Sequence, residues 1–142
     1  MKHPKVIPGT PQPLDDTPLG LSEPTDSFLS RFMLLGKGIC DEAPAHIAVH
    51  LIQDLTDAPA PYVHAHCHPS FDEIGLVIGQ PGALEYEMVL DGEVHRVCAP
   101  ACICIPAGTL HRARAVRGSG AYVCMLMDPR GPNASNTVKA GS

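Results

Sequence analysis

The residues with the clearest capacity for chemistry are histidines that alternate along one short stretch. His64, His66 and His68 stand two positions apart, so in an extended strand their side chains project from one face. Imidazole is a common ligand of divalent transition metals, and this spacing therefore indicates a metal site. By strand parity alone, His64 with His66 is as acceptable a ligand pair as His66 with His68.

Two further candidate ligands lie outside this stretch. Pro69 interrupts the histidine strand, and Glu73 opens the next apolar run, from which its carboxylate can turn back toward the imidazoles. Downstream, a short strand stops at Pro106, and the sharp turn that Pro106 and Gly108 impose re-aims His111. A carboxylate and another imidazole are thus available to complete a site.

These residues resemble the two sequence motifs of the cupin superfamily, over roughly residues 46 to 128. The first motif has two histidines one residue apart, then a glutamate, then a glycine. Its matching positions are His66, His68, Glu73 and Gly79. The second motif, Pro-x-Gly-x-x-His, runs without a gap from Pro106 to His111. Both motifs occur in the family's order and are separated by a hairpin.

The resemblance implies an all-β fold, a small antiparallel β-barrel of the cupin or double-stranded β-helix type, similar to a jelly roll. It also implies a metal set, which consists of His66, His68, Glu73 and His111. The spacing to Glu73 favours His68 over His64 as the second ligand of the histidine strand. His64 is then our candidate catalytic residue, with a purely hydrogen-bonded structural histidine as the alternative.

The implied cofactor is one divalent transition metal ion per chain. Three neutral imidazoles and one carboxylate leave about one net positive charge and one or two open positions in an octahedral shell. These donors suit iron(II), manganese, nickel, cobalt, copper or zinc better than calcium or magnesium. Iron(II) is favoured because many single-domain cupins that this chain resembles are dioxygenases.

We therefore expect a metal-dependent enzyme that acts on a small oxygen-bearing organic molecule, with a non-haem iron(II) dioxygenase as the first hypothesis. The alternative is an isomerase or lyase in which zinc, nickel or manganese is a Lewis acid. A cupin that binds a small ligand without turnover is the third hypothesis.

The composition and charge of the chain limit which partners and which cellular compartment we expect. The chain has 142 residues and a net charge of -5, which suits a single domain, and no basic run suggests nucleic acid or an anionic membrane. It has neither an apolar run of membrane-spanning length nor a signal-peptide core, so we expect a cytoplasmic protein. The resemblance implies a homodimer.

We expect the six cysteines to be free, and Cys98, Cys102, Cys104 and Cys124 to be buried.

The chain divides into three parts. Residues 1–26 are rich in proline and should form an extended arm, residues 27–128 should form the barrel, and residues 129–142 are polar and broken, which predicts a loosely ordered tail. Residues 27–38 favour a strand, and residues 46–55 predict a strand with one mixed face.

The clearest local prediction is a hairpin around Asp91 and Gly92, a pair typical of type I′ turns. A two-residue turn there pairs Glu87 with Arg96, opposite charges across the ladder. Separate strands are expected at 101–105, 111–116 and 121–127.

Overall fold

A computed structural model describes residues 3–12 and 28–141 of the protein, and this part of the chain contains ten strands and no helix. The strands are β1 (Thr10–Pro11), β2 (Leu29–Leu35), β3 (His46–Leu55), β4 (His66–Cys67), β5 (Glu73–Ile78), β6 (Leu84–Leu90), β7 (Glu93–Cys98), β8 (Ala101–Ile105), β9 (His111–Leu126) and β10 (Val138–Lys139). In the described ranges nothing forms a helix that could cross a membrane.

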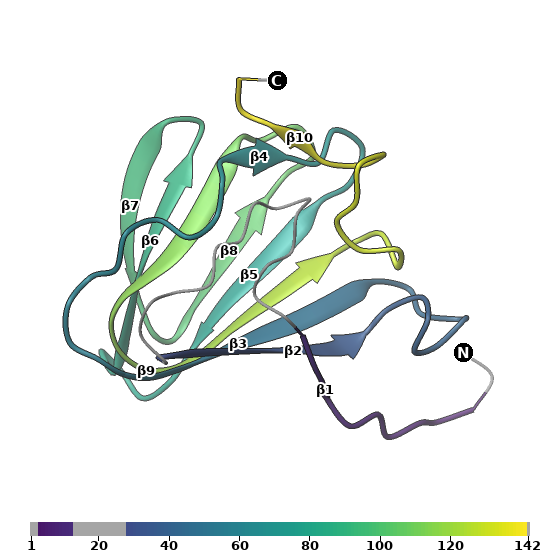
Figure 1. The fold of residues 1–142 in the computed structure, drawn as a ribbon, viewed down its shortest axis with the longest axis horizontal. Coiled ribbons are helices and arrows are strands. Elements are labelled where there is room, and N and C mark those ends of the chain that lie inside the picture. The colour runs from purple at the N-terminus through teal and green to yellow at the C-terminus, as the bar shows by residue number, and fades with distance from the viewer. Residues whose placement is uncertain (1–2, 13–27, 142) are drawn as a thin grey trace.

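Strand β9 organises the fold because it belongs to two sheets. Its C-terminal half pairs with β3 on one side and β5 on the other, and its N-terminal half pairs with β4 and β6. One sheet therefore runs β1-β2-β3-β9-β5-β8, and the other runs β10-β4-β9-β6-β7, with antiparallel pairing throughout. Figure 1 shows β9 bending at the lower left, where it passes from one sheet to the other. The interior lies between these two sheets.

The bend in β9 depends on glycine. Gly118 has φ of 102°, and a side chain there would overlap the carbonyl group of Ala83. The next residue, Ser119, donates its backbone N–H to that same carbonyl at 2.8 Å. The sequence predicts two strands, at 111–116 and 121–127, but the structure joins them into one because the glycine lets the chain bend without leaving the ladder.

The all-β, antiparallel architecture is confirmed, but the sheet is not closed. Among the described strands, β7 pairs with β6 alone and β8 with β5 alone, so both are edge strands. The expected closed barrel is thus an open, two-sheet enclosure. Its apolar core lies between the sheets, and the largest fully buried hydrophobic side chains are Val77, Leu84, Tyr86, Met88 and Leu126.

The hairpin prediction is confirmed in its turn and in its register. Asp91 and Gly92 both have positive φ, 49° and 82°, as a type I′ turn requires. Glu87 lies opposite Arg96 in the β6–β7 ladder, and their side chains form an ion pair at 3.6 Å. The predicted strand at 46–55 has the bounds of β3, and β2 lies within the predicted 27–38.

Short strands near both ends of the chain pair with the sheets. In the arm, β1 pairs with β2, and residues 1–2 and 13–26 lie outside the described part. In the tail, β10 pairs with β4, so that Val138 lies opposite Cys67 and Lys139 opposite His66. The tail is thus built into the second sheet rather than loosely attached, and Figure 1 shows it reaching β4.

The cysteines are free, as expected, but of the four that were expected to be buried, three are exposed and Cys124 is half-buried. Cys98, Cys102 and Cys104 are exposed. The edge strand β8 has one face on the core and one face in solvent, and its side chains alternate between the two. Ile103 and Ile105 point into the core, so Cys102 and Cys104 point outward. An apolar run alone does not reveal which face a cysteine takes.

Candidate metal centre

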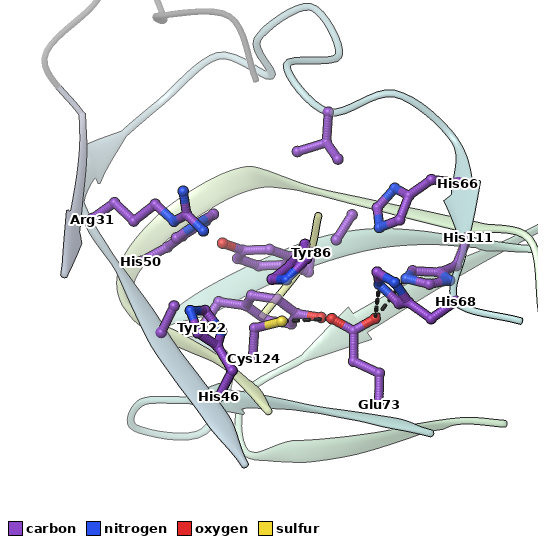
Figure 2. A pocket seen from close by; sticks show the side chains of 14 residues that line it. Arg31, His46, His50, His66, His68, Glu73, Tyr86, His111, Tyr122 and Cys124 are labelled. Carbon is purple, nitrogen blue, oxygen red and sulfur yellow. Dashed lines mark hydrogen bonds and ion pairs between the residues drawn. The ribbon is translucent and has the colours of Figure 1, made fainter. Parts of the chain in front are cut away.

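The structure brings the four predicted ligands together. His66, His68, Glu73 and His111 are all buried, and one candidate ligand atom from each lies within 4.8 Å of the others. The rings of His66 and His111 are closest, with centroids 4.5 Å apart. Figure 2 shows the three imidazoles and the carboxylate converging at one side of a pocket. This group could hold a single metal ion.

Strand pairing explains the convergence. His66 lies directly opposite His111 in the β4–β9 pair, which places two imidazoles from distant parts of the sequence side by side. Glu73 comes from the start of β5, in the other sheet, and reaches the histidines across the interior. His68 follows β4, and its carbonyl accepts the N–H of Gly108 at 2.9 Å, which ties it to the turn before His111.

The protonation of the three imidazoles is fixed by backbone carbonyls. In each ring Nδ1 faces a carbonyl oxygen, and a carbonyl can only accept, so Nδ1 carries the proton and the lone pair of the neutral ring is on Nε2. The bonds run from His66 to His64 at 2.7 Å, from His111 to Thr109 at 2.8 Å and from His68 to Asn136 at 3.1 Å. All three rings are therefore in the tautomer that ligates metal through Nε2.

The inner atoms of this group need a cation. Nε2 of His68, Nε2 of His111 and Oε2 of Glu73 are buried and make no aligned hydrogen bond to any described residue. Yet Nε2 of His111 lies 2.6 Å from Oε2 of Glu73. Two acceptors at this distance repel each other unless a positive charge lies between or beside them. The donors present, imidazole nitrogen and carboxylate oxygen, fit a divalent transition metal.

Without metal, a proton serves this purpose. Burial disfavours the charge on His111, but the adjacent carboxylate of Glu73 outweighs this effect and raises the pKa of His111 above its ordinary value. Burial also opposes ionisation of Glu73, yet His111 lowers the pKa of Glu73 to about 2. Both shifts favour a proton on His111 beside an ionised Glu73, and a metal ion would take the place of that proton.

The second oxygen of the glutamate is held by a thiol. Cys124, on β9, donates from Sγ to Oε1 of Glu73. Burial and the adjacent carboxylate raise the pKa of Cys124 well above its ordinary value, so it stays a neutral donor. The β5–β9 register places Cys124 opposite Gly75, two residues from the ligand and on its face. Sequence reasoning did not find this contact, because it depends on strand register.

A pocket extends from the metal centre into the space between the sheets. Its walls are mainly apolar and aromatic, with polar groups gathered at the metal centre and at the side chains from β2 and β3. The mixed face predicted for residues 46–55 points into it through His46, Ala48 and His50. Figure 2 shows Arg31 and His50 on the side away from the ligands, with the rings of two tyrosines between. The other residues that line it are Val63, Tyr86, Ala113, Tyr122, Cys124 and Pro132.

His64 lies apart from this pocket. The alternation of side chains along an extended strand predicted that His64 would share a face with His66 and His68. The regular strand β4 contains only His66–Cys67, however, so this alternation does not extend back to His64. Its side chain is exposed and is not among the lining residues, while its carbonyl orients the ring of His66. A catalytic role for the His64 side chain stays a prediction. Arg31 and Tyr122 line the pocket instead, and neither was singled out by motif spacing.

No family model matches this sequence, and no curated protein sequence matches it. Solved structures match its fold. A predicted oxalate decarboxylase from Thermotoga maritima has a TM-score of 0.61, with 14% identity over 86% of this chain and 97% of its own. Pac13 from Streptomyces, a nucleoside dehydratase, has a TM-score of 0.55, with 12% identity over 84% of both chains. A Klebsiella pneumoniae protein with a double-stranded β-helix domain has a TM-score of 0.53, with 16% identity over 85% of this chain and 86% of its own.

The two sheets that share β9 and the matching structures define the fold of this protein. It has the cupin fold, the double-stranded β-helix. More particularly, its described residues include a group of three histidines and one glutamate that could bind one metal ion within this fold.

Proposed function

We propose that this protein is an enzyme in which the metal centre and the adjoining pocket together bind a small oxygen-bearing organic molecule and catalyse an isomerase or lyase reaction that needs no dioxygen. When bound, the metal would supply Lewis-acid chemistry at a substrate oxygen. The observation that carries the proposal is a protonated tyrosine, Tyr122, whose hydroxyl lies beside the carboxylate end of the metal centre.

Tyr122 is positioned by its neighbours. Its ring stacks on that of Tyr86, with centroids 4.6 Å apart and planes inclined by 17°. Its hydroxyl lies over Gly75, where any side chain would collide with it, so the glycine on the face of Glu73 makes room for the phenol. Burial, followed by the nearby Cys124 and Glu73, raises the pKa of Tyr122 well above its ordinary value. The hydroxyl therefore keeps its proton and can donate a hydrogen bond or a proton to a substrate oxygen.

The likeness to solved structures supports the reaction class. The names of two of them, a nucleoside dehydratase and a predicted oxalate decarboxylase, describe reactions that break a carbon–oxygen or carbon–carbon bond. Both share this fold at low identity, so the substrates of those proteins are not carried over here.

The test is turnover without oxygen. Protein loaded with zinc, nickel, manganese or iron(II) is incubated under argon in deuterium oxide with a panel of 2-hydroxy and 2-oxo acids, and products and deuterium incorporation are followed by NMR. We expect at least one substrate to lose water, decarboxylate or exchange a carbon-bound proton. Tyr122→Phe should keep its metal content and lose about 100-fold or more in rate. Turnover that requires both iron(II) and dioxygen would contradict the proposal.

The iron(II) dioxygenase remains a second candidate. The donor set favours it, because three imidazoles and one carboxylate leave open positions on an octahedral ion. It predicts dioxygen uptake in an oxygen electrode only when the protein is iron-loaded and a chelating substrate is present. Oxygen uptake that is absent with every member of the panel would exclude it for those substrates.

The homodimer is also a proposal. Leu51 and Ile78 are 43% and 45% exposed on the sheet that contains β3 and β5, which supports apolar contact with a second copy. Light scattering after size exclusion measures the mass directly, and a monomer at all concentrations would contradict the proposal.

A further inference from the structure

The two carboxylate oxygens of Glu73 have different surroundings. Oε2 faces the imidazoles, with Nε2 of His111 at 2.6 Å and Nε2 of His68 at 3.7 Å. Oε1 accepts a hydrogen bond from Sγ of Cys124. Figure 2 shows the thiol on one side of the carboxylate and the imidazoles on the other. Of the two oxygens, Oε2 is the one that is buried without an aligned hydrogen bond to a described residue.

Strand pairing holds the thiol beside the carboxylate. In the β5–β9 ladder Cys124 lies opposite Gly75, and Glu73 is two residues before Gly75 on the same face. Side chains on such a diagonal are within reach of each other. Cys124 also lies opposite Ala48 of β3, so its backbone is held by a strand on each side. The sulfur is not a member of the group of candidate ligands, so any effect on a metal ion passes through Glu73.

We infer that Cys124 is a positioning residue, which holds Oε1 of Glu73 so that the glutamate offers a metal ion Oε2 alone. A carboxylate binds a metal through one oxygen or through both, and the second oxygen takes up a position in the metal's shell. Oε1 would have to give up its hydrogen bond to approach the ion, so the bond favours the one-oxygen mode. The position that is kept free is open to a ligand from the pocket.

This inference rests on the proposed function in one respect, because it requires that a metal ion binds at the centre. It does not depend on which reaction the enzyme catalyses. Its test therefore measures how the metal is coordinated, and turnover is not needed.

The experiment uses protein loaded with cobalt(II), whose visible absorption reports the coordination of the ion. Acetohydroxamate is titrated as the probe, because it binds a metal through two oxygens and needs adjacent open positions. Cys124→Val removes the hydrogen-bond donor and keeps a side chain of similar size. We expect its cobalt spectrum to differ from that of wild type, and acetohydroxamate to bind about 10-fold or more weakly, since Glu73 then takes up one of those positions.

Further variants assign the effect to the hydrogen bond. Cys124→Ser keeps a donor at the same place and should restore both the wild-type spectrum and the affinity for acetohydroxamate. Cys124→Ala loses the donor with a smaller side chain, and it tests the same expectation if Cys124→Val folds poorly. The matched control is Cys104→Ala, which removes an exposed thiol of β8 and should change neither measurement.

The other outcomes overturn the inference in distinguishable ways. If the variants without a donor match wild type in spectrum and affinity, or if Cys124→Ser behaves as they do, the hydrogen bond does not set the coordination of Glu73. If cobalt-loaded wild type does not bind acetohydroxamate, no open positions are kept; in all these cases the metal centre itself still stands. If wild type binds no cobalt, the proposed function fails together with the inference.

Discussion

The imidazole of His68 donates its Nδ1 proton to the backbone carbonyl of Asn136, 3.1 Å away and 68 residues later in the chain. The hydroxyl group of Thr137 lies 3.2 Å from the same nitrogen. The C-terminal segment is thus part of the metal centre, because it holds one ligand ring in the orientation that turns Nε2 inward. Pro132, in the same segment, lines the pocket.

Loosening this segment should weaken metal binding. The side-chain amide of Asn136 donates to Asp128 at 2.7 Å and to the carbonyl of Gly131 at 2.8 Å, and these bonds hold the loop that presents its carbonyl to His68. We expect Asn136→Ala to lower metal affinity by about 10-fold to 100-fold, as loss of an outer hydrogen bond to a ligand commonly does. Competition with a chromophoric chelator measures the affinity.

The matched control is Asn133→Ala, in the same loop, whose side-chain carbonyl oxygen accepts bonds from the exposed Ser135. It should change metal affinity much less. Equal losses in Asn133→Ala and Asn136→Ala would show that the loop matters only through its general stability.

Gly75 should not tolerate a side chain. A methyl group there would meet the hydroxyl and ring of Tyr122, and the stacked Tyr86 leaves that ring little freedom to move. We expect Gly75→Ala to destabilise the fold by about 1–3 kcal/mol, the usual cost of overpacking, and to reduce turnover because the phenol is displaced. Urea unfolding measures the free energy.

The neighbouring Gly79→Ala is its control, because a methyl group at Gly79 would make ordinary contacts of 3.4 Å or more. That variant should unfold at nearly the wild-type urea concentration. If Gly75→Ala behaves in the same way, Tyr122 is not confined as the structure shows.

The acid stability of the protein should depend on Asp128. Hydrogen bonds from Arg130 are the largest cause that lowers the pKa of Asp128 from 3.8 to about 2, against the opposing effect of burial. Because the folded-state pKa is depressed, this carboxylate stabilises the fold above pH 3.8, and the stabilisation is lost as the pH falls from about 4 to about 2.

Urea unfolding of metal-free protein at several pH values between 6 and 2 tests this. Asp128→Asn should be less stable than wild type at pH 6, and the difference should shrink toward pH 2. A difference that does not change with pH would mean that the ionised form of Asp128 has no special role.

The features that sequence predicted well are those fixed by local rules. The turn at Asp91 and Gly92 sets the hairpin register because both residues accept positive φ and the loop has only two residues. The ligands Glu73 and His111 were predicted from the resemblance to the cupin motifs, supported by the turns at Pro69 and at Pro106 and Gly108 that precede them.

The features that sequence missed depend on contacts between distant segments. The role of Asn136 requires the tail to return to β4, and nothing in its polar composition indicates this. The inward position of Arg31 depends on the register of β2 with β3, which places Arg31 opposite His50 on the face that lines the pocket. His64 was misplaced by parity because the strand that carries His66 is only two residues long.

The central claim is that His66, His68, Glu73 and His111 bind one metal ion, and the metal content of equilibrated protein tests it most directly. Metal-free wild type, Glu73→Gln and the surface control Glu85→Gln are dialysed against equal low concentrations of iron(II), zinc, manganese or nickel without oxygen, then analysed for metal per chain. The account predicts close to one ion per chain in wild type and in Glu85→Gln, and a large loss in Glu73→Gln. Wild type that retains none of these metals, or Glu73→Gln that retains as much as wild type, would contradict it.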